Sequence, residues 1–166
     1  MKRAAPHAEP APASLTDLAC ACATARQVAR VLTQLYDTWL GGTGLEAPQF
    51  ALLMALDKQG AVSQAAIGRR YALDKTTISR NLKVLQRKGL IVSSSADDKR
   101  ERRFTLTAEG DKRLASAKPA WKKAQDHLRS GLTEKQWDAM FDAFRAVAGA
   151  AQTAQRSLDT RAVRSR

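Results

Sequence analysis

Lysine and arginine side chains are concentrated in one stretch near the middle of the chain. Residues 69–103 contain 11 Lys and Arg against 4 Asp and Glu, an excess of 7 positive charges in 35 residues. The whole chain carries 28 Lys and Arg, 16 Asp and Glu and a formal net charge of +12. Ammonium and guanidinium groups at this density attract polyanions, of which nucleic acid is the commonest. A basic protein without a nucleic-acid role is the alternative that charge alone leaves open.

The segment DKTTISRNLKVLQRKG, residues 74–89, predicts a helix with Ile78, Leu82 and Leu85 on its buried face. A guanidinium can read a guanine through two hydrogen bonds, ammonium groups suit phosphates, and short hydroxyls suit either. We expect Arg80 to be the residue that reads a base. The candidate DNA contacts on or beside the open face are Lys75, Thr76, Thr77, Ser79, Arg80 and Lys83.

The segment DDKRERRFTLT, residues 97–107, places a charged run directly before a strand-forming one. A charged run is usually a solvated loop, but residues 90–92 supply a second strand, so the pattern predicts a β-hairpin with a basic tip. Arg100 lies near that tip and could enter a minor groove, whose narrow parts have an enhanced negative potential. We expect Asp98 to pair with a neighbouring arginine and to hold the loop in shape. The other candidate contacts in this segment are Lys99, Arg102 and Arg103.

Both segments belong to a small predicted domain, residues 47–107. Helical spacing predicts a short helix over 48–58 and another that begins after Ser63. Asp74 can accept backbone N–H bonds at the start of the next helix, and Gly89 can end it in the left-handed conformation. Helix, turn and helix followed by a β-hairpin make a winged helix-turn-helix, whose second helix enters the major groove of DNA.

Longer helices are predicted on both sides of this domain, over residues 15–46 and 108–154. Apolar residues recur there every three or four positions in three stretches, and Thr133-x-x-Gln136 fits a capping box at the start of the last one. Such repeats indicate helices that pack along one another, and a homodimer is the natural way to bury them. An ordinary intramolecular bundle is the alternative.

The ends of the chain, residues 1–14 and 155–166, lack this pattern and are expected to be tails, the second of them basic. The expected fold is therefore mainly α with a small β-hairpin wing. Its winged helix-turn-helix is flanked by long N- and C-terminal dimerisation helices.

Several other classes of protein are not expected from this composition. The chain has no run of roughly 18 apolar residues that could span a membrane and no apolar stretch of a signal peptide. Cys20 and Cys22 are its only cysteines, so we expect a cytoplasmic protein with reduced thiols and no disulfide framework. A metal site would need more ligands than these thiols with His7 and His127 offer. No Gly-rich phosphate loop or paired-carboxylate constellation is present, so neither an enzyme nor a cofactor is expected.

The run DKTTISRNLKVLQRKGLIVSSSADDKRERRFTLTAEG, residues 74–110, resembles the recognition helix and wing of MarR-type (multiple antibiotic resistance regulator) transcriptional regulators. The wing pattern Asp98-x-Arg100 with a following acid and arginine, and then Leu106-Thr107-x-x-Gly110, carries most of this resemblance. With the flanking long helices it covers roughly residues 15–152.

The resemblance implies a homodimer whose first and last helices form the dimer interface. It also implies binding to a pseudo-palindromic operator in double-stranded DNA, usually with repression of transcription. Such regulators release DNA when a small phenolic acid, another aromatic ligand or an oxidant acts. The ligand pocket would lie between the dimerisation helices and the winged domain, where Tyr36 and Trp39 are candidates for its lining or for the core.

Cys22 has two interpretations. A branch of the same family senses organic hydroperoxides through a cysteine and a tyrosine that correspond to Cys22 and Tyr36. Two further tyrosines of that branch are replaced here by Arg26 and Ala47, so a small packing residue in a helix seam is the alternative. Cys20 lies about 200° around the same helix and is not expected to bridge to Cys22. A non-specific nucleoid-type DNA binder and an enzyme of thiol chemistry are the other hypotheses.

Overall fold

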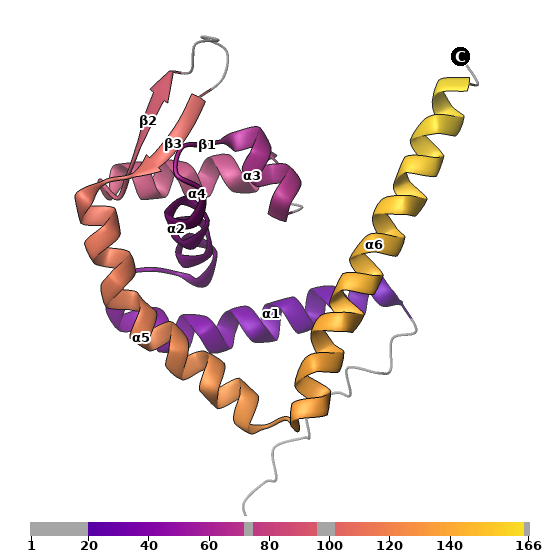
Figure 1. The fold of residues 1–166 in the computed structure, drawn as a ribbon, viewed down its shortest axis with the longest axis horizontal. Coiled ribbons are helices and arrows are strands. Elements are labelled where there is room, and N and C mark those ends of the chain that lie inside the picture. Colours follow the sequence, from indigo (N-terminus) through magenta and orange to yellow (C-terminus); the bar gives the residue numbers. More distant parts are fainter. Residues whose placement is uncertain (1–19, 72–74, 96–101, 165–166) are drawn as a thin grey trace, which may run out of the picture. The chain divides into compact units, whose positions relative to one another are not determined.

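The computed structural model describes residues 20–71, 75–95 and 102–164 (Figure 1). The tail at 1–14, Asp74 and the hairpin tip with Asp98, Lys99 and Arg100 lie outside the described residues. The chain divides into two compact units, Met1–Trp121 and Lys122–Arg166. Its elements are α1 (Ala21–Leu40), the 3-10 helix η1 (Gly41–Thr43), α2 (Ala47–Gln59), β1 (Val62–Ser63), α3 (Gln64–Tyr71), α4 (Lys75–Arg87), β2 (Ile91–Ser95), β3 (Arg102–Leu106), α5 (Ala108–Ser130) and α6 (Glu134–Arg164).

The first unit contains the predicted winged helix-turn-helix. The helices α3 and α4 form the helix-turn-helix pair, and β2 and β3 form the hairpin of the wing, which projects beyond them (Figure 1). The two strands pair antiparallel with Ile91 opposite Leu106. The Ser63 hydroxyl accepts a hydrogen bond from the Ala66 N–H at 3.2 Å, so it caps α3 as predicted.

The sheet has a third strand, β1, which the sequence did not predict. Its two residues precede α3 directly and pair antiparallel with β3, Val62 opposite Phe104. The strand order is therefore β1-β3-β2. A strand of two residues carries no alternation that could reveal it, so only the pairing with β3 identifies it.

One hydrophobic core holds the first unit together. The ring of Trp121 on α5 stacks on Phe50 of α2 with the centroids 5.9 Å apart, so the first part of α5 is tied to the winged domain. The largest fully buried side chains come from α1, α2, α3, α4, β2, α5 and the turn before β2; they are Leu40, Leu53, Leu56, Ile67, Ile78, Leu82, Leu85, Leu90, Ile91 and Leu114.

The second unit contains the end of α5 and the whole of α6. The predicted capping box is formed: the Thr133 N–H donates to Gln136 Oε1 at 2.9 Å, and the Gln136 N–H donates to Thr133 Oγ1 at 3.2 Å. The sequence placed the end of this helix near residue 154, but α6 continues to Arg164. This last stretch is rich in alanine, glutamine and arginine, which favour helix, and Gln155 donates to Asp159 one turn on at 3.0 Å.

Candidate nucleic-acid interface

The helix α4 has one apolar and one basic face. Ile78, Leu82 and Leu85 are buried in the core, as their spacing predicts. The residues farthest around the helix from these three follow one another at intervals of three or four, and all are exposed. This outward stripe consists of Thr76, Arg80, Lys83 and Arg87.

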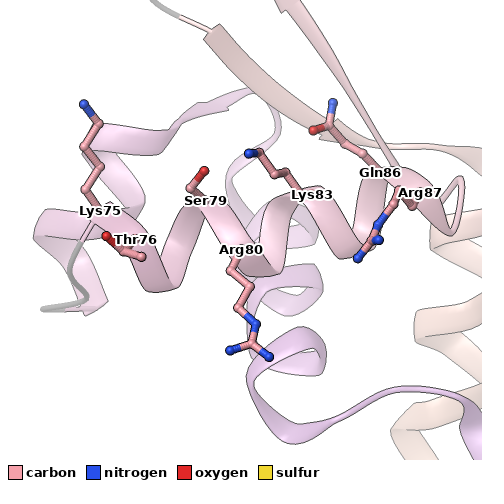
Figure 2. Close-up of a pocket in the computed structure, with 7 residues that line it drawn as sticks. All are labelled: Lys75, Thr76, Ser79, Arg80, Lys83, Gln86 and Arg87. Carbon is pink, nitrogen blue, oxygen red and sulfur yellow. The ribbon is translucent and has the colours of Figure 1, made fainter.

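Seven side chains of α4 line an open hollow of about 880 Å³. Figure 2 shows Ser79, Lys83 and Gln86 projecting to one side of the helix and Arg80 to the other. Four of the seven are basic, and α4 has no acidic residue. The lining residues are Lys75, Thr76, Ser79, Arg80, Lys83, Gln86 and Arg87. A concave surface with this charge suits a polyanion.

Hydrogen bonds from the neighbouring elements fix α4 in place. Near its first turn, Gln64 Nε2 of α3 donates to the Lys75 carbonyl oxygen at 3.2 Å. Near its last turn, Gln86 Nε2 donates to Ser93 Oγ of β2 at 3.3 Å, which joins the helix to the wing. The exposed face of α4 is thus presented by a fixed backbone.

The base of the wing is fastened to the turn that follows α4. The Thr107 hydroxyl donates to the Gly89 carbonyl oxygen at 2.7 Å and accepts from the Gly110 N–H at 3.0 Å. Gly89 has the left-handed conformation, φ 69°, that was expected at the end of this helix. The motif Leu106-Thr107-x-x-Gly110 therefore has a structural role, which is to set the hairpin against the end of α4.

The candidate contacts divide into three groups. Lys75, Thr76, Ser79, Arg80 and Lys83 all line the hollow on α4, whereas Thr77 is exposed but is not among its lining residues. Arg102 and Arg103 are exposed at the start of β3. The sequence interpretation omitted Gln86 and Arg87, although Arg87 lies eleven residues after Thr76, three helical turns along the same stripe.

The two aromatic candidates for a ligand pocket lie at the C-terminal end of α1. Tyr36 is half-buried against the core, and this burial raises the pKa of its hydroxyl above the ordinary value. Trp39 is exposed. A separate shallow hollow of about 340 Å³ lies on α1, and neither aromatic residue lines it. Its lining residues are Arg26, Ala29, Arg30, Thr33 and Gln34.

Both thiols are exposed at the start of α1. Cys22 was considered as a packing residue, but the first turns of the apolar stripe, with Ala25 and Ala29, are exposed in this chain. Cys20 precedes the helix with an extended backbone, φ −121° and ψ 107°. The helical angle used to separate the two thiols therefore does not apply to Cys20.

Two further searches were confined to the described part of the chain. Within it, His, Cys, Asp and Glu residues do not gather in groups of three or more that could hold a metal ion. None of the helices it contains is both long and apolar enough to cross a membrane.

Comparison with known proteins gives a consistent assignment. A family model described as "MarR family" matches residues 43–101. The transcriptional regulator MosR of M. tuberculosis, solved in complex with DNA, is 31% identical with a TM-score of 0.74, over 81% of this chain and 98% of MosR. The PcaV regulator of Streptomyces coelicolor, solved with its natural ligand, is 26% identical with a TM-score of 0.72, over 80% and 94% of the two chains. The transcriptional regulator HosA of Escherichia coli is 36% identical over 76 residues, which are 45% of this chain and 56% of HosA.

Proposed function

Because this chain belongs to the MarR family of DNA-binding transcriptional regulators, we propose that it is a homodimeric repressor released from its operator by a small aromatic acid. The observation that carries the proposal is the outward stripe of α4, on a helix whose opposite face is buried in the core. Regulators of this class act on the chromosome, so we expect the protein in the cytoplasm.

In the proposed complex α4 lies in the major groove. Arg80 reads a guanine through two hydrogen bonds, while Thr76, Thr77 and Ser79 contact phosphates or base edges. Lys75, Lys83 and Arg87 neutralise phosphates. Arg102 and Arg103 meet the backbone beside the wing, and Arg100 at the wing tip enters the adjacent minor groove. Asp98 keeps the role predicted for it, which is to hold the tip in shape.

The homodimer is supported by apolar surface that the chain leaves exposed. On α6 the side chains of Phe141, Phe144 and Val147 are 38%, 47% and 57% exposed and follow one another at intervals of three. A stripe of this kind on a 31-residue helix marks a surface for another protein chain. A second copy buries it symmetrically and places two recognition helices for a pseudo-palindromic site.

The proposed ligand is a small aromatic carboxylate that binds at α1. Arg26 and Arg30 lie one turn apart beside the hollow of about 340 Å³, and a guanidinium binds a carboxylate through paired hydrogen bonds. The PcaV regulator, solved with its natural ligand, supports a ligand-responsive role for this fold. Tyr36 and Trp39 stay candidates for the aromatic wall of such a site in the dimer.

An oxidant is the second candidate for the signal, because both thiols are exposed. Solvent-accessible thiols are the ones that peroxides oxidise. In this alternative Cys22 is the sensor and its oxidation, in place of an acid, releases the DNA.

A gel-shift titration against the DNA upstream of the gene for this protein tests these proposals. Random competitor DNA is present, and the titration is repeated with a salicylate-like acid and with an organic hydroperoxide. We expect a specific shift that the acid releases. Release by the peroxide that is lost in Cys22→Ser would select the oxidant alternative. Equal affinity for operator and competitor would instead indicate a nucleoid-type protein and reject the repressor.

A further inference from the structure

The C-terminal end of α1 is held by two cations that come from other helices of the first unit. α1 has no basic residue in its own last turn, and the exposed carbonyl groups at the end of a helix carry partial negative charge. Lys88 Nζ donates to the Gly44 carbonyl oxygen at 2.7 Å, across 44 residues of sequence. Arg113 of α5 donates to the adjacent carbonyl, that of Thr43, at 3.1 Å.

Lys88 has a second acceptor, the side-chain oxygen of Gln49 in α2, at 3.0 Å. Gln49 is 3% exposed, so this acceptor is fixed in position. A hydrogen bond with one charged partner is stronger than a neutral one. The ammonium of Lys88 therefore fastens its own backbone to the connection between α1 and α2.

That backbone belongs to the end of α4. Lys88 directly follows Arg87, the last residue of the helix, and its N–H donates to the Val84 carbonyl at 3.0 Å. The side chain runs to Gly44 and Gln49 and is not among those that line the hollow on α4. Lys88 thus links the end of α4 to the end of α1 and is not part of the proposed DNA-binding surface.

We propose that Lys88 is a positioning residue for DNA binding, which fixes the C-terminal end of α4 to the end of α1 without contacting DNA itself. This inference rests on the proposed use of α4 in the major groove. Base-reading hydrogen bonds tolerate displacements of only tenths of an ångström, so an α4 held at its N-terminal end by Gln64 but released at the other end loses its register with the bases.

The test compares Lys88→Met with Lys118→Met in the full-length protein. The ammonium of Lys118 on α5 pairs with Asp57 on α2 at 3.1 Å, so the control variant also loses one charge and one contact between elements of the same unit. It does not touch α4 or residues 43–49. We expect Lys88→Met to weaken operator binding about tenfold, the usual order for one lost charge-assisted hydrogen bond, and Lys118→Met to change it by less than about twofold.

Salt dependence separates positioning from contact. A lysine that neutralises a phosphate contributes about 0.9 to the slope of log K against log salt concentration. We expect the slope of Lys88→Met to equal that of the wild type. A slope reduced by about 0.9 would make Lys88 a phosphate contact and overturn the proposal, and so would equal losses in Lys88→Met and Lys118→Met.

A double-mutant cycle identifies the path. Gln49→Met removes one acceptor of Lys88, and we expect the double variant to lose no more affinity than Lys88→Met alone. Additive losses would show that the two residues act separately, contrary to the proposal. Failure of the repressor hypothesis is detected independently, since it appears in the wild type as equal affinity for operator and random DNA. The Lys88 comparison is then made on that random DNA and remains decisive.

Discussion

Gly110, in the first turn of α5, passes so close to Leu90 that a Cβ atom on it would overlap the Leu90 carbonyl oxygen. The same oxygen accepts a hydrogen bond from the Thr107 N–H at 3.1 Å, so it cannot move away freely. Glycine is needed here for close approach, since its φ is not in the left-handed region.

Gly110→Ala is therefore expected to destabilise the fold by about 1–3 kcal/mol, the range for a methyl group forced into a packed site. Chemical denaturation at one fixed protein concentration measures this loss. Gly149→Ala is the matched control, because Gly149 lies within α6 with nothing near its missing Cβ. Alanine there should stabilise the helix by roughly 0.5–1 kcal/mol. A neutral Gly110→Ala would mean that Leu90 can yield.

Arg80→Ala is expected to weaken operator binding by about 1–3 kcal/mol and to relax the preference at one base pair, if Arg80 reads a guanine through two hydrogen bonds. Affinities for the operator and for operators substituted at each position measure both effects. An equal loss on operator and random DNA would show that Arg80 contacts the backbone and not a base.

Lys83→Met is expected to weaken binding to operator and random DNA by the same factor, because a phosphate carries no sequence information. The slope of log K against log salt concentration should fall by about 0.9. Titrations at several salt concentrations measure both quantities. An unchanged slope would remove Lys83 from the phosphate contacts.

Phe144→Glu is expected to dissociate the homodimer, because it places a charge in the centre of the exposed apolar stripe of α6. Light scattering after size-exclusion chromatography measures the mass. Ala146→Glu is the control, since a residue two positions along points to the opposite side of the helix. A Phe144→Glu protein that stays dimeric at micromolar concentration would show that another surface holds the copies together.

Regular spacing in the sequence predicted the helices of the winged domain and their buried faces. Ile78, Leu82 and Leu85 are buried as their intervals required, and the Thr133–Gln136 box is formed. Both features are local, because they depend on residues within one or two turns of a helix.

The features that the sequence did not predict depend on contacts between distant segments. Nothing near Lys88 indicates that its ammonium reaches Gly44, and nothing near Val62 indicates a strand that pairs with Phe104. The exposure of Cys22 is of the same kind, since an apolar stripe does not say whether its own chain or another one covers it. Arg87 is the exception, because continuing the helical stripe from Thr76 would have found it.

The strand order β1-β3-β2 has a consequence for how the molecule opens. Because β3 is hydrogen-bonded along both edges, the wing cannot detach from the helix-turn-helix without also breaking its pairs with the strand that leads into α3. The hairpin and the recognition helix should therefore unfold as a single cooperative unit, with local fraying confined to the end of the hairpin far from Thr107.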